Sequence, residues 1–236
     1  MKKQPLISVI IPCYNEVNTI GIVINKINQL RKLKTQIIVI DDCSTDGSLY
    51  FIKKKLINKI DKLIIHKKNL GKGAAIKSAV KYVKGDVVII QDADLEYYPE
   101  DYYKLIKPII NWDYKVVYGS RVLNKKRYFS KNFISLFRIF ANHILTITSN
   151  IINKQNITDA HTCYKVFHKS VFKNLNLIEN DFSFCPEVTT KISNKNITIY
   201  EVPIRYKGRE FSQGKKISYK DAIKAIYVLF KYKFFK

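Results

Sequence analysis

Three closely spaced carboxylates follow an apolar run, and they are the side chains of this chain best suited to bind a metal. The run at residues 87–90 is apolar and β-branched, and Asp92, Asp94 and Glu96 come directly after it. Such a run predicts a buried parallel strand, and ligands bind at the carboxyl ends of such strands. Carboxylates this close repel one another unless a cation lies between them. Oxygen ligands of this kind predict Mg²⁺ or Mn²⁺ bridged to substrate phosphates, whereas a polar turn without a ligand is the alternative.

An alternation of strands and helices predicts the sheet that would position these carboxylates. The apolar pattern predicts strands at residues 7–12, 36–40, 62–66 and 87–90, and helices at residues 18–33, 46–57 and 74–83. This alternation is typical of an α/β fold with a mostly parallel central sheet and helices on both faces. After residue 100 the pattern loosens, and it predicts helices at 101–110, 133–152, 186–193 and 219–236, strands at 115–118, 162–167 and 198–202, and loops at 125–131 and 207–216.

Length and charge limit the classes of protein that the chain can be. Its 236 residues, of which 47% are hydrophobic, suffice for one domain with a sizeable core. The net charge of +23 indicates an anionic partner such as a nucleic acid, a phosphorylated ligand or an anionic membrane. Lysine spread over the whole chain, as from an AT-rich coding sequence, would give the same excess. The four cysteines show no metal or disulfide spacing, and no apolar run has the length of a signal peptide or a membrane span, so a reducing, cytoplasmic location is expected.

Polar residues also follow the other three strands predicted in the N-terminal part. They are the segments 12–16 (PCYNE), 41–47 (DDCSTDG) and 69–73 (NLGKG). In the last segment, Gly71 and Gly73 would let the backbone approach a phosphate, and the helix N-terminus that follows favours an anion. Together with the carboxylates after the fourth strand, these segments predict a nucleotide pocket with a metal at its floor.

Three of the motifs resemble those of the family 2 glycosyltransferases, which adopt the GT-A fold, a nucleotide-binding α/β sandwich. These motifs are residues 8–16 (SVIIPCYNE), 41–47 (DDCSTDG) and 91–94 (QDAD). Within the family, the chain looks like the dolichyl- and polyprenyl-phosphate mannosyl- or glucosyltransferases. That likeness extends through Gly119–Arg121, Asp159–Lys165, Pro186–Glu187 and Gly214–Ile217, so the resemblance covers nearly the whole chain.

The resemblance implies a role for each matching position. The metal ligands would be Asp92, Asp94 and Glu96, and the acceptor phosphate would be bound by Arg121 with Arg127 or Arg138. The nucleotide sugar would contact Pro12, Tyr14, Glu16, Asp41, Asp42, Gly71, Lys72, Asp92, Ala93, Arg209, Lys215 and Lys216, the last three on a loop that closes over the diphosphate. The catalytic residues would be Asp94, Arg121, Asp159 and Glu187.

Several of these residues also have a purely structural interpretation. The alternatives are a capping turn for Asp41–Asp42, an N-cap for Asp159, a first-turn acid for Glu187 and a solvated charge run for Lys215–Lys216. The chain also departs from the family pattern, because residues other than the expected acids stand at His161, Cys185 and Gln213. These departures leave the sugar and the acceptor open.

The implied reaction is the inverting transfer of a hexose from a GDP-mannose or UDP-glucose type of donor to a polyprenyl phosphate. An ionised phosphate needs no general base, and arginines suffice to bind it. A hydroxyl acceptor, in diacylglycerol or a polysaccharide, needs a base, for which Asp159 or Glu187 would be the candidate. A sugar-1-phosphate nucleotidyltransferase would need a basic Gly-rich loop after the first strand, and residues 12–16 lack one. A basic nucleic-acid-binding domain is the non-enzymatic alternative.

One catalytic domain is expected, with a nucleotide-sugar-binding half at residues 1–121, an acceptor-side half at 122–218 and a basic amphipathic helix at 219–236. That helix would either pack on the domain or lie on a membrane surface. The expected partners are a nucleotide-sugar donor and a lipid-phosphate acceptor, with peripheral contact at the inner face of the cytoplasmic membrane. No nucleic acid is expected as a partner, and self-association into a homo-oligomer is left open.

Overall fold

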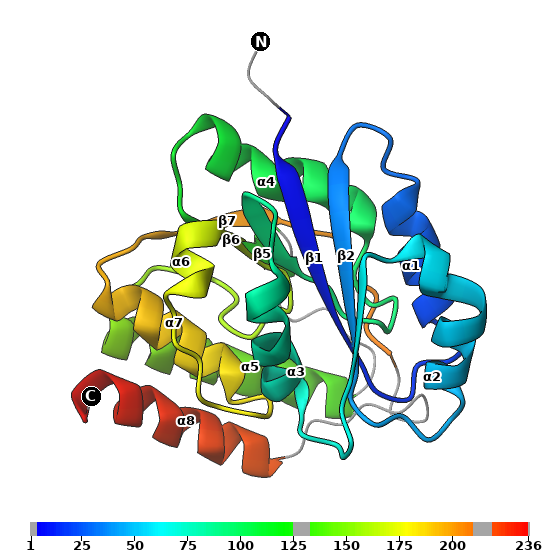
Figure 1. Cartoon of the computed structure of the whole chain (residues 1–236). Coiled ribbons are helices and arrows are strands. Elements are labelled where there is room, and N and C mark those ends of the chain that lie inside the picture. The colour runs from blue at the N-terminus through cyan, green and yellow to red at the C-terminus, as the bar shows by residue number, and fades with distance from the viewer. Residues whose placement is uncertain (1–3, 125–132, 210–218, 236) are drawn as a thin grey trace.

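A seven-stranded sheet positions every other element of the molecule (Figure 1). The computed structural model describes residues 4–124, 133–209 and 219–235, and the side chains of the helices that begin at 133 and 219 from residues 139 and 222 onward. The strands are β1 (Leu6–Cys13), β2 (Lys34–Asp41), β3 (Lys62–Ile65), β4 (Val87–Ile90), β5 (Val116–Ser120), β6 (Lys165–His168) and β7 (Ile199–Pro203). Their order is β3-β2-β1-β4-β6-β5-β7, and the neighbouring pairs are parallel except the two that β6 makes. The predicted α/β fold with a mostly parallel sheet is confirmed.

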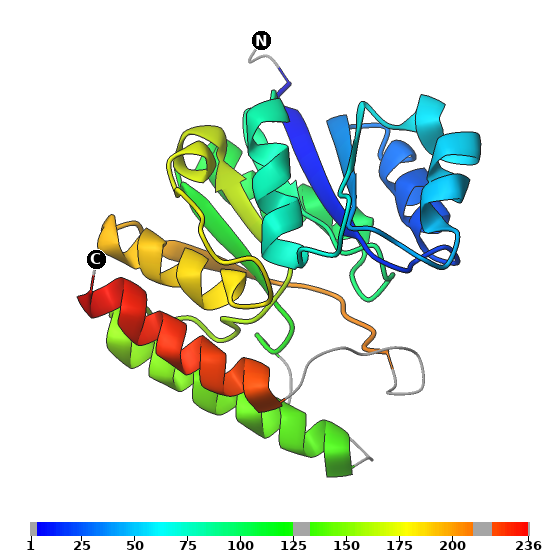
Figure 2. The same ribbon diagram turned by 60° about the horizontal axis from the view of Figure 1, so that its bottom comes forward.

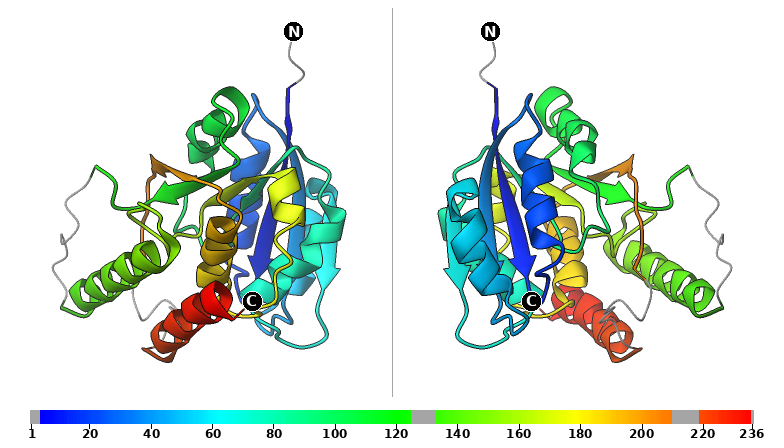
Figure 3. Two further views of the ribbon diagram at one scale, coloured as in Figure 1. Left: turned by 90° about the vertical axis from the view of Figure 1, so that its left-hand side faces the viewer. Right: turned by 90° about the vertical axis from the view of Figure 1, so that its right-hand side faces the viewer.

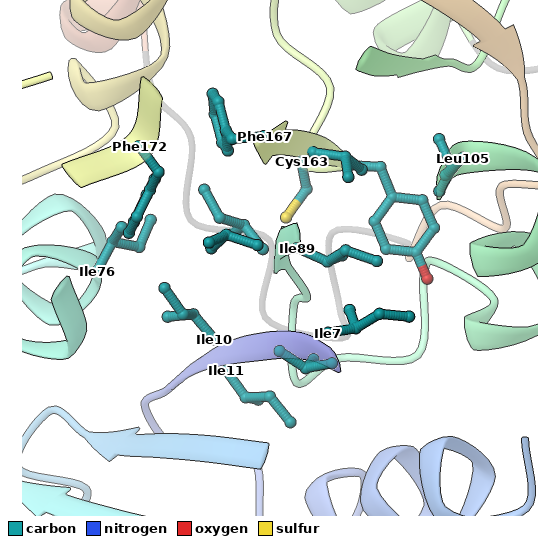
Figure 4. Close-up of a cluster of buried hydrophobic side chains, with 14 of the residues drawn as sticks. Ile7, Ile10, Ile11, Ile76, Ile89, Leu105, Cys163, Phe167 and Phe172 are labelled. Carbon is teal, nitrogen blue, oxygen red and sulfur yellow. The ribbon is translucent and has the colours of Figure 1, made fainter. Parts of the chain in front are cut away.

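β1 lies in the middle of the sheet and is buried on both faces. Ile7, Ile10 and Ile11 have no exposed surface. Since consecutive side chains of a strand point to opposite faces, the burial of both Ile10 and Ile11 means that helices cover the sheet from either side. Figure 4 shows these three side chains in one cluster with Ile89 of β4 and Phe167 of β6. This apolar centre fixes the strand ends that carry the polar motifs.

The helices lie around the sheet, and the two longest pack together at one end of the molecule. They are α1 (Ile20–Asn28), α2 (Ser48–Phe51), α3 (Lys72–Ala79), α4 (Tyr102–Asn111), α5 (Phe133–Asn153), α6 (Lys169–Lys173), α7 (Phe184–Asn194) and α8 (Tyr219–Phe234). α8 packs against both α5 and α7, and Figure 2 shows α5 and α8 side by side. In both views of Figure 3 this pair lies at the lower end of the molecule, toward which β1 points. The C-terminal helix therefore packs on the domain.

One sheet contains strands from both predicted halves of the chain, because β7 pairs with β5. The division of the chain into those halves stays a prediction.

Two of the predicted helices end early or are divided in the structure. The helix expected at 18–33 ends at Asn28, yet Leu30 is buried in a turn that its N–H closes on the carbonyl of Ile27. The apolar spacing that continues past Asn28 therefore reflects the burial of Leu30 in a turn and not a longer helix. The helix expected at 46–57 is divided into α2, a π-helical turn and a 3₁₀ turn, at Ser48–Phe51, Ile52–Leu56 and Ile57–Lys59.

The strand expected at 162–167 begins only at Lys165. The Lys165 side chain is fully buried, and its Nζ donates hydrogen bonds to the carbonyl oxygens of Ala160 (3.0 Å) and Thr162 (2.6 Å). Those bonds hold residues 160–164 as a loop at the sheet edge. A short-range apolar pattern cannot reveal such a bond, and for the same reason the short helix α6, which directly follows β6, was not predicted.

Two glycines let α3 start close to another part of the backbone. A Cβ on Gly71 would lie 2.6 Å from the carbonyl oxygen of Asn180, and one on Gly73 would lie 2.4 Å from that of Glu179. The N–H of Ala74 donates to the Asn180 carbonyl at 2.9 Å. Close contact with the 179–181 segment therefore requires both glycines. The phosphate contact that the sequence predicted for them stays a prediction.

Gly73→Ala should destabilise the fold by about 1–3 kcal/mol, because the added methyl group forces backbone apart. Urea unfolding measures this change. Gly47→Ala is the matched control, since nothing lies within 4 Å of a Cβ at Gly47 and only its φ of 93° opposes the substitution. A loss at Gly73 no larger than the loss at Gly47 would contradict the crowding of the α3 N-terminus.

Candidate active site

The side chain of Arg209 lies among three carboxylates that come from two strand ends. Its Nη1 donates to Glu16 Oε1 at 3.0 Å, its Nη2 donates to Asp94 Oδ2 at 3.0 Å, and its backbone N–H donates to Glu96 Oε1 at 2.7 Å. Glu16 follows β1 and the other two acids follow β4. The guanidinium compensates like charges that would otherwise repel one another. Four residues predicted from the sequence are thus brought together, and we call them the Arg209 cluster.

The carboxyl group of Asp94 has a pKa well above the usual range of an aspartate. Burial, with the charges of Asp92 and Glu96, raises the pKa of Asp94 to about 7, against the opposing effect of Arg209. Leu95, between the two acids that follow β4, has a φ of 62°, a left-handed conformation that costs a branched residue free energy. A raised carboxyl pKa beside a strained backbone is typical of a binding or catalytic site.

Asp92 forms an ion pair with Lys72, at the N-terminus of α3. The Lys72 Nζ donates to Asp92 Oδ1 and also contacts the Cys163 Sγ at 3.3 Å. Although burial would lower it, the neighbouring Asp92 raises the pKa of Lys72 well above its usual range. Lys72 is therefore a fixed cation beside the Arg209 cluster, where the sequence predicts a diphosphate.

The acidic residues fit a divalent ion only in part. Both Glu96 oxygens are engaged, since Oε2 accepts from the Tyr206 hydroxyl at 2.8 Å and Oε1 from the backbone of Arg209. Within residues 4–124, 133–209 and 219–235 no group of three acidic, His or Cys side chains is arranged to hold a metal. Mg²⁺ commonly uses one or two carboxylates together with substrate phosphates, and Asp92 with Asp94 meets that requirement. The three-carboxylate ligand set stays a prediction.

Asp42 and Asp41 have different surroundings at the end of β2. Asp42 Oδ1 accepts from His66 Nδ1 (2.7 Å) and the N–H of Leu70, and its Oδ2 accepts from the N–H of Gly71. Asp42 therefore holds the 69–71 turn in place. Asp41 is fully buried, and its Oδ1 has no hydrogen-bond partner within the described residues. A buried acceptor of this kind requires an explanation, and a ligand N–H would supply one.

Arg121 and Asp159 form a bidentate ion pair that Tyr206 links to the Arg209 cluster. Arg121 Nε and Nη2 each donate to a different Asp159 oxygen at 2.7 Å, and the Arg121 N–H donates to Asp159 as well. The guanidinium also lies over the Tyr206 ring, 5.2 Å from its centroid. Burial would raise the pKa of Asp159, but Arg121 outweighs it and holds that pKa below its usual range. Asp159 is thus ionised and committed to orienting Arg121.

Glu187 lies in the first turn of α7 and has no exposed surface. Its carboxylate accepts hydrogen bonds from the N–H groups of Ile178 (2.6 Å) and Glu179 (2.9 Å) and from Lys191 Nζ (2.7 Å). Within the described residues, these contacts hold the 178–179 backbone on α7, and none reaches the Arg209 cluster. The structure therefore gives Glu187 a structural role; its predicted catalytic role stays untested.

The remaining predicted positions fall into two groups. Pro12, Tyr14 and Ala93 lie at the same sheet edge, at the end of β1 and after β4. Arg127, Lys215 and Lys216 lie outside the described residues, and Arg138 lies on α5 in the part whose side chains are not described.

Some residues that support the site were not predicted from the sequence. Tyr206 contacts both Glu96 and Arg121. Glu201 on β7 accepts from the N–H groups of Thr158 (2.6 Å) and Asp159 (3.0 Å), which holds the loop that carries Asp159. His161 in that loop is neutral at physiological pH, because burial and the charge of Lys165 lower its pKa to about 4. Tyr206 and Glu201 form no recognisable sequence motif with Arg121. They come close to it only in the folded protein, because β7 pairs with β5.

The strands β3, β2, β1 and β4 are parallel, and carboxylates and cations lie together after their carboxyl ends. This arrangement is typical of nucleotide-binding α/β proteins. Residues 8–175 match the family described as Glycosyl transferase family 2, and the chain belongs to that family. It is an enzyme, a nucleotide-sugar glycosyltransferase, and the resemblance found in the sequence is confirmed.

Two curated relatives and one solved structure are similar over most of this chain. The chain is 31% identical over 243 residues (95% of this chain, 94% of the relative) to the UDP-N-acetylglucosamine–dolichyl-phosphate N-acetylglucosaminyltransferase of Methanococcus voltae. It is 29% identical over 235 residues (96% of this chain, 64% of the relative) to the dolichol-phosphate mannosyltransferase of Pyrococcus furiosus. Glucosyl-3-phosphoglycerate synthase from Mycobacterium tuberculosis, solved with Mn²⁺ and UDP-glucose, matches with a TM-score of 0.71 at 16% identity, covering 97% of this chain and 79% of that one. The structural likeness confirms the GT-A fold.

Arg209→Gln should make Mn²⁺ bind at least about fivefold more tightly in the absence of nucleotide, because a cation no longer neutralises Glu16 and Asp94. Electron paramagnetic resonance of free Mn²⁺ measures this affinity. Arg205→Gln is the matched control, since Arg205 pairs instead with Asp101. An unchanged affinity in Arg209→Gln, or the same change in both variants, would contradict the assignment of Arg209 as the counter-ion of this cluster.

Proposed function

We propose that the enzyme transfers a hexose or N-acetylhexosamine, with inversion, from a nucleotide sugar to a polyprenyl phosphate at the inner face of the cytoplasmic membrane. The relatives named for dolichyl-phosphate transfer support this acceptor class, and one of them is named for a UDP-N-acetylglucosamine donor. The chain would act as one catalytic domain, with its donor half at 1–121 and its acceptor half at 122–218.

The observation that carries the choice of acceptor is that both predicted bases are already engaged. Asp159 is ion-paired with Arg121, and Glu187 accepts three hydrogen bonds without any exposed surface. A hydroxyl acceptor must lose a proton to a base during attack, whereas a lipid phosphate is already an anion. The engaged carboxylates therefore favour the phosphate.

The geometry of Arg121 supports the choice of this acceptor. Its Nε and Nη2 are held by Asp159, and its Nη1 makes no hydrogen bond within the described residues. Arginine binds phosphate through a rigid, planar set of donors, so a pre-oriented guanidinium loses little entropy on binding. In this proposal Arg121 contacts the acceptor phosphate, and Asp159 is a positioning residue.

The donor would lie along the strand ends of β1, β2 and β4. The buried Asp41 Oδ1 would accept an N–H of the nucleobase, and Lys72 and Arg209 would contact the diphosphate as it leaves. Asp94 and Asp92 would hold Mg²⁺ or Mn²⁺, which supplies charge neutralisation for the departing nucleoside diphosphate. The acceptor oxygen would then attack the anomeric carbon from the face opposite the diphosphate.

Asp159→Asn should retain transfer to polyprenyl phosphate while the KM for that acceptor rises about tenfold, because Arg121 loses the charge that orients it. The KM for the donor should stay unchanged. Product formation is measured with polyprenyl phosphate, diacylglycerol and free sugar acceptors in parallel, using GDP-mannose, UDP-glucose and UDP-N-acetylglucosamine as donors. Product only with a hydroxyl acceptor, abolished in Asp159→Asn, would replace the proposal by a glycolipid or polysaccharide synthase with Asp159 as base.

A further inference from the structure

Helix α5 has its polarity reversed relative to a helix of a water-soluble protein. Among its described side chains, at residues 139–153, the four exposed ones are all large and apolar: Phe140, Ile144, Ile147 and Ile151. Its buried side includes Thr146, Ser149 and Asn153, which form hydrogen bonds to the protein. A surface helix normally turns its apolar stripe inward and its polar side to water. The outward stripe is continuous, because its members are three or four residues apart.

Helix α8 adds a second apolar stripe beside the first. Its inward side buries Ala225, Val228, Leu229 and Tyr232. Its exposed apolar side chains are Ile223, Ile226, Tyr227, Phe230 and Phe234, again at helical spacing. α5 and α8 contact each other and lie side by side in Figure 2. Together the two stripes hold nine of the nineteen exposed large hydrophobic side chains of the described residues, and we call them the α5–α8 face.

The three lysines of α8 whose side chains are described contact the domain. Lys224 pairs with Asp181, Lys231 pairs with Glu179, and Lys233 donates to Ser193 and Asn194. These contacts hold α8 against α7 and the loop before it. The sequence predicted that this helix would either pack on the domain or lie on a membrane through its basic side. Among the described side chains, three lysines contact the domain and five large apolar side chains are exposed.

We propose that the α5–α8 face inserts its apolar side chains into the interfacial layer of an anionic lipid bilayer. This inference rests on the proposed function and names the surface by which the enzyme reaches its lipid acceptor. Helices that lie in the plane of a membrane bury an apolar face of this kind in the layer between headgroups and acyl chains. No helix within the described residues is both long and apolar enough to cross a bilayer.

The net charge of the chain and the position of the α5–α8 face both favour a lipid bilayer as the binding partner of this face. The chain carries a net charge of +23, and the sequence segments that enter the two helices are basic, with Lys125, Lys126, Arg127 and Lys131 before α5 and Lys215 and Lys216 before α8. A second copy of the chain would carry the same charge and be repelled, whereas anionic lipid attracts such segments. The face also lies at the end of the molecule toward which β1 points, the end that carries the Arg209 cluster (Figure 3).

Flotation with vesicles made of equal parts phosphatidylcholine and phosphatidylglycerol tests the proposal. Two double variants remove apolar surface without adding charge: Ile147→Gln with Ile151→Gln, and Tyr227→Gln with Phe230→Gln. The matched control is Ile22→Gln with Tyr50→Gln, which removes exposed apolar side chains on α1 and α2. Each double variant of the face should lower vesicle partitioning at least about tenfold, since each buried apolar side chain contributes strongly to insertion, and the control should change it less than about twofold.

Three results would overturn the proposal. The first is wild-type partitioning in both double variants whose circular dichroism melts match the wild type. The second is binding that high salt abolishes while the substitutions leave it unchanged, which would indicate purely electrostatic contact. The third is an absence of vesicle binding together with a dimer in light scattering that the substitutions dissociate, which would assign the face to a second copy.

The proposed function is tested separately with a short-chain polyprenyl phosphate dispersed in detergent. The double variants should transfer sugar to this acceptor at the wild-type rate, because no bilayer is present. Loss of vesicle binding with retained transfer in detergent supports the α5–α8 face. If the wild type floats with vesicles but transfers to no lipid phosphate in either medium, the proposed acceptor is wrong while the membrane surface stands.

Discussion

The insertion of one guanidinium among acids from distant parts of the chain is the interaction on which this site depends. Arg209 joins Glu16 after β1 to Asp94 and Glu96 after β4, although nearly the whole chain separates the first acid from the arginine. Without a cation these carboxylates would repel one another and open the carboxyl edge of the sheet. A metal and a diphosphate would add further charges at this position. The need to neutralise these carboxylates therefore links the fold to the proposed donor site.

A second ion pair, between Arg121 and Asp159, lies where the acceptor is proposed to bind. Its two parallel hydrogen bonds fix the arginine and engage both oxygens of the Asp159 carboxylate. Glu201 and Lys165 hold the loop that carries Asp159, each through hydrogen bonds to its backbone. Tyr206 connects the two sides by contacting both Glu96 and Arg121. The residues proposed for the donor and for the acceptor are therefore held by one connected network.

The sequence predicted the parallel half of the fold well because each strand there is a continuous apolar run ending in a polar motif. Asp92, Asp94, Glu16 and Arg209 could be singled out from local motifs and a family resemblance. The sequence could not show that Arg209 lies between the acids or that Asp42 holds the 69–71 turn through backbone N–H groups. It also could not show that the Glu187 carboxylate accepts hydrogen bonds from two backbone N–H groups. Those facts depend on contacts between segments far apart in the chain. Periodicity likewise showed α5 to be amphipathic but could not tell which side faces the protein.

The most direct test of the account is the thermal stability of the protein with nucleotide sugars, measured with and without Mn²⁺. A ligand that binds only the folded state raises the Tm. GDP-mannose, UDP-glucose or UDP-N-acetylglucosamine should raise the Tm of the wild type only when Mn²⁺ is present, and Asp94→Asn should abolish that rise while keeping the wild-type circular dichroism spectrum. A nucleotide sugar that raises the Tm equally in a metal chelator, or equally in Asp94→Asn, would contradict the assignment of this strand end as the donor site.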